Sequence, residues 1–360
     1  MSKPEWLIAA PISATNTKAD TKLFQYLVRL IRGGNLPVRE SADFFRALTD
    51  RNANLAQIAG ALTALTAKGE TGEEIAGMTS AMYEQSEKIT TRHSNFVNIS
   101  GTGLSSTKTF NVSTAAAFVA AGAGLPVAKH TGRALMSRSG GAEVLEALGV
   151  KVSIEPKVAQ AGLDGAGLCF LFSTKFHPSS RRLKDISRNL GIRTCLNLLE
   201  ALANPANAPK QLVGVWHPAL IEPVAKALSL LKTEYAWVVH GADGLDELTL
   251  TGETFVTEIS GKQISTFKIT PEEFGLKRAG IKHLNVKTPK ESAEIIKEVL
   301  ENKRRDEARS LVVINAAAAL VIGGIADKPI KAARLAEQSI DSRSAQTKLE
   351  RLISVTNKNK

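Results

Sequence analysis

From residue 95 onward, short apolar runs alternate with helical segments, and this alternation restricts the fold more than any other feature of the chain. The strand-like runs are Asn95–Ser100, Leu125–Ala128, Gly167–Phe172, Leu212–Val215 and Tyr235–His240. Segments with helical spacing of apolar residues, such as Thr114–Gly122 and Pro218–Leu231, lie between them. Alternation of this kind is typical of a mostly parallel sheet covered by helices.

The chain on either side of this region is mainly helical. Apolar residues recur at helical spacing in Lys22–Arg32, Glu40–Leu48, Leu55–Lys68 and Glu73–Glu87, and again in Pro289–Glu301, Ala308–Ile322 and Pro329–Ile353. Residues 256–269 alternate as in an antiparallel hairpin, with a turn at Gly261. The predicted fold class is α/β, with a small all-helical N-terminal domain and a large α/β domain that contains a mostly parallel sheet.

The change from helical segments to alternating strands and helices predicts the domain boundaries. Residues 1–20 are expected to form a loose tail and residues 21–92 a helical domain, to which a helical stretch at about 181–203 contributes. Residues 93–355 are expected to form the α/β domain. The length of 360 residues agrees with about two domains.

The composition is that of an ordinary globular protein, with 43% hydrophobic and 22% charged residues. Two cysteines, Cys169 and Cys195, lie in apolar stretches, so we expect buried free thiols in a reducing compartment. The longest uncharged run, Ser310–Ala326, is short for a membrane span. The predicted location is the cytoplasm, without a membrane segment.

The net charge indicates an anionic partner. With 46 basic and 35 acidic residues, the formal charge is 46 − 35 = +11. A phosphorylated small molecule and a nucleic acid both fit this charge. The basic residues that would face a nucleic acid include Arg181, Arg182, Lys303, Arg304, Arg305, Lys358 and Lys360.

The loop from Ser100 to Thr114 is the most specific local signal. It reads S-GTGLSSTKTFNVST and joins a predicted strand to a predicted helix. Gly101 and Gly103 allow a ligand to approach the backbone closely, and the helix N-terminus and Lys108 add positive charge. The loop therefore predicts phosphate binding, although it matches neither the Walker nor the dinucleotide pattern.

Two adjacent carboxylates, Asp246 and Glu247, follow the predicted strand Tyr235–His240. Hard oxygen ligands of this kind suit Mg²⁺, which retains water and substrate phosphate oxygens in its coordination shell. From the residues alone, an exposed acidic turn is the favoured interpretation.

The phosphate loop and several later segments resemble the anthranilate phosphoribosyltransferase family. GTGLSSTKTFNVST resembles the family's GTGGDGxxTxNIST, and VAKHTGRALMSRSGGAEVLEALGV resembles VAKHGNRxxSSxSGxADxLEALG. Further matching segments follow in order: FHPSSRRLKDISRNLGIRT, LLEALANPANAP, GADGLDELTLTGET and INAAAALVIGG. The helical start with AKGETGEEIAGM is similar as well, so the resemblance covers roughly residues 20–355.

The resemblance implies a reaction, a cofactor and an assembly. The reaction is displacement of diphosphate from 5-phosphoribosyl diphosphate (PRPP) by a nitrogen acceptor, with Mg²⁺, in the cleft between the two domains of a homodimer. Residues 93–355 would then bind PRPP. No covalent nucleophile is expected, because the protein mainly positions the reactants and stabilises the leaving group.

The resemblance also assigns roles to residues. The PRPP-binding residues would be Gly101, Thr102, Gly103, Ser105, Thr109, Asn111, Ser113, Thr114, Lys129, Ser137 and Ser139. The metal would be held by Ser113, Asp246 and Glu247. The acceptor side would include His130, Gly132, Ser187, Arg188 and Glu200.

Several residues depart from the family pattern, and most of these lie on the acceptor side. The family's Gly-Asp-Gly in the phosphate loop is Leu104-Ser105-Ser106 here. The Asn beside the acceptor is Gly132, the Arg that pairs with the anthranilate carboxylate is Ser187, and the Gly-Pro before LxNP is Glu200-Ala201. Losing the Arg removes a charge-assisted pair worth about 1.5–3 kcal/mol. The departures therefore predict a nitrogen acceptor other than anthranilate.

Two further functions remain open from the sequence. TGRALMSRSGG loosely resembles a nucleoside phosphorylase segment, in which Arg133 and Ser137 would hold a base. Alternatively, a basic paralogue without turnover would bind nucleic acid through its positive surface. The order and spacing of the motifs favour the transferase.

Overall fold

A computed structural model describes residues 18–133 and 139–358. The N-terminal unit is a bundle of four helices, α1 (Lys18–Ile31), α2 (Val38–Thr49), α3 (Leu55–Lys68) and α4 (Gly72–Glu84). Side chains just before α3 and α4 cap their first turns: Asn54 accepts from two backbone amides of α3, and Thr71 forms a capping box with Glu74. The four predicted helices are therefore present. The predicted tail covers residues 1–17, which lie outside the described residues, and residues 18–20, which already belong to α1.

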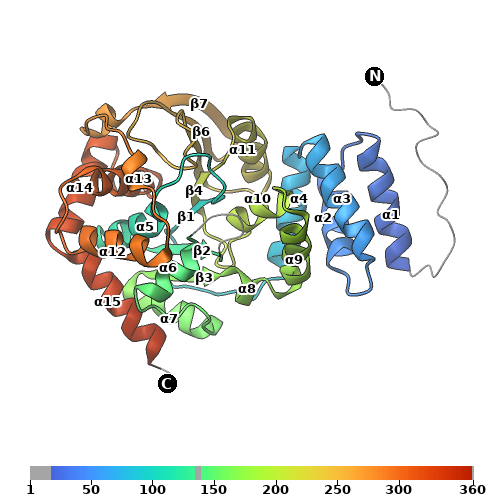
Figure 1. The fold of residues 1–360 in the computed structure, drawn as a ribbon, viewed down its shortest axis with the longest axis horizontal. Coiled ribbons are helices and arrows are strands. Elements are labelled where there is room, and N and C mark those ends of the chain that lie inside the picture. The colour runs from blue at the N-terminus through green and yellow to red at the C-terminus, as the bar shows by residue number, and fades with distance from the viewer. Residues whose placement is uncertain (1–17, 134–138, 359–360) are drawn as a thin grey trace.

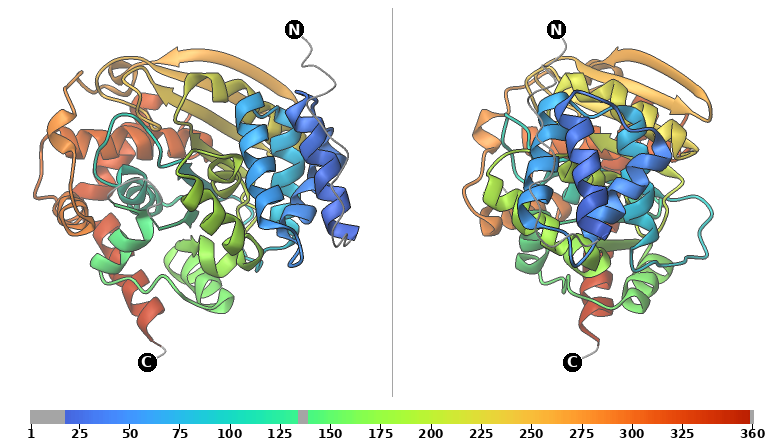
Figure 2. Two further views of the ribbon diagram at one scale, coloured as in Figure 1. Left: turned by 45° about the vertical axis from the view of Figure 1, so that its right-hand side comes forward. Right: turned by 90° about the vertical axis from the view of Figure 1, so that its right-hand side faces the viewer.

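The larger unit contains one seven-stranded sheet in the order β3-β2-β1-β4-β5-β6-β7. The strands are β1 (Val97–Gly101), β2 (Val127–Thr131), β3 (Leu168–Phe172), β4 (Lys210–Gly214), β5 (Tyr235–Gly241), β6 (Thr254–Ser260) and β7 (Gln263–Ile269). Strands β1 to β5 pair in parallel, and β6 and β7 form an antiparallel hairpin at one edge of the sheet (Figure 2). The predicted fold class, with its mostly parallel sheet, is confirmed.

The remaining helices lie around the sheet or between it and the N-terminal bundle (Figure 1). They are α5 (Val112–Gly122), α6 (Gly141–Ala147), α7 (Pro156–Ala166), α8 (Ser173–Phe176), α9 (Arg181–Leu190), α10 (Cys195–Leu202), α11 (Ile221–Leu230), α12 (Pro289–Leu300), α13 (Glu307–Ile322), α14 (Pro329–Asp341) and α15 (Ser344–Asn357). Short 3-10 turns precede α9 and α11, at Pro178–Ser180 and Pro218–Leu220.

One C-terminal prediction was wrong. The continuous helix expected over Pro329–Ile353 is two helices, α14 and α15, which meet at Ser342 and Arg343. Arg343 has φ of 60°, in the left-handed region, and this conformation cannot continue a right-handed helix.

Alternate residues of the strands enter different cores. Leu212, Trp237 and Val239 join a core with helices α5 and α12 to α15. Val213 and Val238 point the other way, into a core that also contains α1 to α4 and α9 to α11. Burial on both faces explains why these strands are apolar throughout. Both cysteines are buried free thiols, as the sequence predicts.

The order of the strands indicates where in the fold a ligand would bind. From β1 the chain continues to β2 and β3 on one side, whereas β4 and β5 lie on the other side of β1. Ligands of open parallel sheets bind at such a reversal, beyond the carboxyl ends of the strands. Helices α9 and α10 lie between the four-helix bundle and the sheet, near this reversal (Figure 1).

Candidate functional site

A cavity opens at the reversal of the strand order and collects almost all of the predicted site residues. Its lining includes the loop after β1, the end of β2, one side of α10 and the segment after β5. The predicted residues that line it are Gly101, Thr102, Gly103, Ser105, Thr109, Asn111, Ser113, Thr114, Lys129, His130, Gly132, Ser139, Glu200, Asp246 and Glu247. Ser137 lies outside the described residues.

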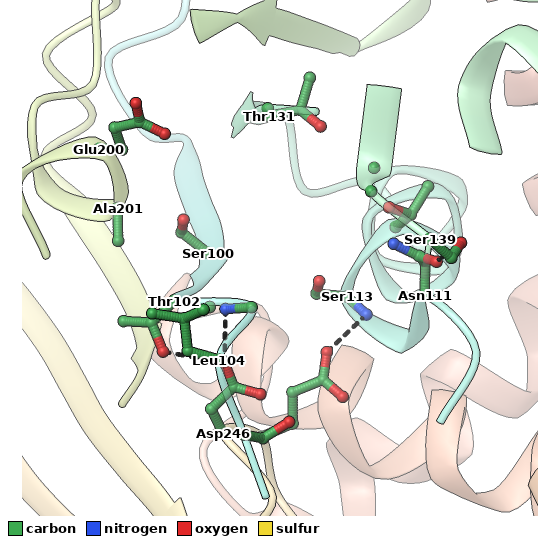
Figure 3. Close-up of a pocket in the computed structure, with 18 of the residues that line it drawn as sticks. Ser100, Thr102, Leu104, Asn111, Ser113, Thr131, Ser139, Glu200, Ala201 and Asp246 are labelled. Atoms are coloured by element: carbon green, nitrogen blue, oxygen red, sulfur yellow. Dashed lines mark hydrogen bonds between the residues drawn. The ribbon is translucent and has the colours of Figure 1, made fainter. Parts of the chain in front are cut away.

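The phosphate loop is fastened to the neighbouring strand and to a carboxylate. Gly103, with φ of 68°, donates its N–H to Asp246 Oδ2 over 2.7 Å, and the Thr102 hydroxyl donates to the same oxygen over 3.0 Å (Figure 3). The Thr102 N–H donates to the carbonyl of Gly214 at the end of β4. A left-handed φ favours glycine, and this explains Gly103 at the bend.

The loop residues that depart from the family pattern, Leu104 to Ser106, make their own contacts with the rest of the protein. Leu104 is buried, and its carbonyl accepts from Arg193 over 2.8 Å. The Ser105 hydroxyl donates to the carbonyl of Thr107 over 2.7 Å, and Ser106 donates to the carbonyl of Gly244. Hydroxyl contacts and one buried leucine therefore hold the loop in place of the family's glycines.

The two adjacent carboxylates face the loop and the first turn of α5. Glu247 Oε1 accepts the backbone N–H of Ser113 over 2.9 Å (Figure 3). Burial, and then the charge of Asp246, raises the pKa of Glu247 to about 8. Oxygen donors whose charges repel each other in a buried position suit a divalent cation. The described residues contain no cluster of three or more His, Cys, Asp or Glu side chains, so water and substrate oxygens would complete such a site.

Lys129 reaches from β2 to the same end of the cavity. Its Nζ donates to the carbonyl of Ile99 over 2.6 Å and to the hydroxyl of Ser113 over 3.2 Å. Burial lowers the pKa of Lys129 to about 8. Nearby, the Ser139 hydroxyl donates to Asn111 Oδ1 over 2.8 Å, which links the segment before α6 to the start of α5 (Figure 3).

The predicted acceptor side is only partly assembled. His130, Gly132 and Glu200 line the cavity, whereas Ser187 and Arg188 do not. The buried Ser187 hydroxyl lies 3.0 Å from that of Thr194, and the exposed Arg188 pairs with Asp185 over 3.1 Å.

The sequence reasoning missed Lys184. Its Nζ lies 2.8 Å from Glu200 Oε1. Leu183, Lys184 and Ser187 are the buried residues of α9, so a lysine one turn before Ser187 on the buried face was the available signal.

Two buried histidines adjoin this ion pair. The rings of His130 and His177 lie 5.1 Å apart, between centroids. Burial keeps the pKa of His130 well below its usual range and lowers that of His177 to about 4, and the charge of Lys184 acts in the same direction. Both rings are therefore neutral at pH 7, and Lys184 is a cation that acts on both of them.

Several residues that the two alternative functions would use are already paired with acidic side chains or backbone carbonyls of the protein. Arg133 lines the cavity, but its guanidinium binds Glu146 over 2.8 Å and lies 3.7 Å from Glu143. Several residues of the basic runs have partners in the same way: Arg182 with backbone carbonyls, Lys303 with Glu301, Arg304 with Glu298 and Asp306, and Arg305 with Asp341. In the described part of the chain, no helix has the length and apolar character of a membrane span.

Comparisons with known proteins place this geometry in a family. Residues 93–346 match the glycosyl transferase family a/b domain, and residues 24–86 match the helical bundle domain of the same family. Anthranilate phosphoribosyltransferase of Moorella thermoacetica is 45% identical over 90% of this chain and 96% of its own. The enzyme of Persephonella marina is 39% identical over 91% of this chain and 97% of its own.

Solved structures agree with the sequence comparison. The crystal structure of anthranilate phosphoribosyltransferase from Thermus thermophilus has a TM-score of 0.87 at 35% identity, covering 92% of this chain and 99% of its own. The enzyme of Saccharomyces cerevisiae in complex with PRPP and Mg has a TM-score of 0.86 at 27% identity, with 94% and 99% covered. The resemblance seen in the sequence is confirmed, and the chain belongs to the anthranilate phosphoribosyltransferase family of glycosyl transferases.

Proposed function

We propose that this protein transfers the phosphoribosyl group of PRPP to a nitrogen acceptor with Mg²⁺ as cofactor. The observation that carries the proposal is the shared cavity, in which the phosphate loop and the Asp246-Glu247 pair face a wall that contains Glu200. A structure of the yeast relative contains PRPP and Mg, and this supports the choice of donor and metal.

Each part of the cavity has a task in this reaction. The N-terminus of α5 and the amides of the loop would bind diphosphate, and Asp246, Glu247 and Ser113 would hold Mg²⁺. When bound, the metal neutralises charge on the departing diphosphate. The C1–oxygen bond breaks with oxocarbenium character and diphosphate leaves, while the acceptor nitrogen forms the new bond to C1 and gives up one proton to solvent. The loop and α10 then act mainly by positioning the two reactants.

The first acceptor to test is anthranilate, because the curated relatives are named for it and one yeast structure contains 4-fluoroanthranilate. The assay follows loss of anthranilate fluorescence with PRPP and Mg²⁺, and release of diphosphate checks the stoichiometry. Turnover that depends on both PRPP and Mg²⁺ supports the proposal. An absence of PRPP binding in calorimetry with Mg²⁺ would contradict it.

A different nitrogen acceptor is the second candidate. It is favoured by Ser187, which faces Thr194 and presents no cation to the cavity. In the same assay, diphosphate release with another aromatic amine and none with anthranilate would support this candidate.

The assembly is proposed to be a homodimer, as the family resemblance implies. Light scattering should then give twice the chain mass of 38.4 kDa. A nucleic-acid partner is the weaker proposal, because many side chains of the basic runs are already paired.

A further inference from the structure

An ion pair that is largely shielded from water adjoins the acceptor end of the cavity, and its carboxylate partner lines the cavity. Lys184 Nζ from α9 lies 2.8 Å from Glu200 Oε1 of α10, and their side chains are 10% and 18% exposed. Lys184 also donates to the hydroxyl of Ser173. Because Lys184 has two oxygen partners, it is already engaged when a ligand arrives.

The second carboxylate oxygen of Glu200 is directed into the cavity. Figure 3 shows the Glu200 carboxylate beside the cavity, across from Thr131. Glu200 Oε2 lies 3.6 Å from the point that a Cβ on Gly132 would occupy. The missing side chain at Gly132 therefore leaves space next to a carboxylate oxygen. Among the described residues, no hydrogen-bond donor reaches this oxygen.

The two histidines that the structure describes at this end add no positive charge. His130 lines the cavity, and its Nε2 is buried without a hydrogen-bond partner in the described chain. It is neutral at pH 7, as is His177. Among the described basic residues that line the cavity, Lys129 is bound to Ile99 and Ser113, and Arg133 to Glu146, whereas Lys108 interacts with Asp246 at the metal end.

These charges discriminate between acceptors. An acceptor carboxylate would lose hydration and meet the carboxylate of Glu200, and among the described residues beside it no unpaired cation would compensate. An uncharged amine would instead donate an N–H to Glu200 Oε2 and place a second polar group against His130 Nε2. Buried polar groups left without partners are a strong source of specificity in enzymes.

We propose that the Lys184–Glu200 pair selects an uncharged aromatic or heteroaromatic amine as acceptor and excludes carboxylates such as anthranilate. This inference rests on the phosphoribosyl transfer proposed above. It assigns Glu200 to binding of the acceptor N–H, Lys184 to holding Glu200 in place, and Gly132 to the space that the acceptor occupies.

The test compares two acceptors that differ mainly in charge, anthranilate and its neutral amide 2-aminobenzamide. With PRPP and Mg²⁺, the unmodified protein should show at least a tenfold higher kcat/KM for the amide. Glu200→Gly frees Lys184 to meet a carboxylate and should reverse the preference. Glu200→Gln keeps the shape, removes the charge and should reduce the preference by raising KM for the amide.

The controls separate this inference from the proposed function. Glu155→Gln removes a carboxylate paired with Lys175 outside the cavity and should leave both kcat/KM values unchanged. Calorimetry of PRPP with Mg²⁺ should give the same affinity for every variant, and thermal melts check folding. If PRPP does not bind, the proposed function fails. If PRPP binds while the protein prefers anthranilate, transfers to neither amine or keeps its preference in both Glu200 variants, only the specificity assignment fails.

Discussion

The N–H of Gly103 and the carboxylate of Asp246 meet over 2.7 Å, and this contact joins the phosphate loop to the proposed metal site. Since the hydroxyl of Thr102 donates to the same oxygen, one aspartate organises the loop and also offers charge to a cation. Loading of the metal and binding of diphosphate should therefore depend on one side chain.

Asp246→Asn keeps an oxygen acceptor for the loop and removes the charge. We expect Mg²⁺-dependent binding of PRPP to weaken by about tenfold or more, since bonds to a charged group contribute about 1.5–3 kcal/mol. Calorimetry with and without Mg²⁺ measures this change. Glu253→Gln, which disrupts an exposed pair with Lys268, is the control and should leave the affinity unchanged. Equal affinities for Asp246→Asn and the unmodified protein would remove Asp246 from the metal site.

Gly214→Ala should damage the site through crowding. A Cβ at this position would lie 1.6 Å from the carbonyl oxygen of Asp246, so the chain must shift. Overpacking of this kind costs about 1–3 kcal/mol in the free energy of unfolding. We expect a lower Tm and weaker PRPP binding. Gly252→Ala has no neighbouring atom within 4 Å and should change neither quantity. Similar melts for the two variants would show that the strand end tolerates the added methyl group.

Lys184→Met should destabilise the fold, because Glu200 would remain buried without its cation. The expected loss in the free energy of unfolding is about 1–3 kcal/mol, reduced where water still reaches the carboxylate. Adding Glu200→Gln to Lys184→Met should restore most of this loss. Denaturant unfolding of both single variants and the double variant completes a double-mutant cycle. Additive effects would mean that the two side chains do not interact.

Arg343→Gly should raise stability, because Arg343 adopts φ of 60° between α14 and α15. Left-handed geometry costs an L-residue roughly 1–2 kcal/mol, and part of this gain is offset by the entropy of glycine in the unfolded chain. The same change at Arg351, inside α15, should lower stability by about 1 kcal/mol. Opposite shifts in Tm for the two variants are expected, and shifts of the same sign would contradict the explanation.

Duplex DNA should bind weakly at most. The side chains of the run from Lys303 to Arg305 each lie within 2.9 Å of a carboxylate oxygen, which reduces the charge available to phosphates. An electrophoretic shift at low salt should be faint and should disappear near physiological salt. Tight binding with a steep salt dependence would favour the nucleic-acid interpretation instead.

The parts of the fold that the sequence predicts well are those with regular apolar patterns. The bounds of α3, for example, agree with the 3.6-residue spacing over Leu55–Lys68. Helices α6 and α7 were not predicted, because they are short and glycines border or interrupt them. The break at Arg343 was missed for a different reason. Glycine in a sequence indicates a possible left-handed turn, whereas arginine does not.

The donor side of the site is similarly easier to predict than the acceptor side. Residues from Gly101 to Thr114 form one continuous motif, so a single segment carries most of the predicted phosphate-binding residues that line the cavity. The partner of Glu200 lies on another helix, and only the three-dimensional packing of α9 against α10 places Lys184 beside it. Sequence identity with the family therefore predicts the fold more reliably than it predicts which charged side chains pair near the proposed acceptor site, such as Lys184 with Glu200.

The division of the apolar interior between the two faces of the sheet has an evolutionary consequence. Helix α5, which begins after the phosphate loop, packs in one core. Helices α9 and α10 pack in the other core, together with the N-terminal bundle. Substitutions at the acceptor wall can therefore accumulate without disturbing the packing beneath the donor loop. An ancestral transferase could exchange its nucleophile by altering one layer, and its descendants would keep the same activated sugar.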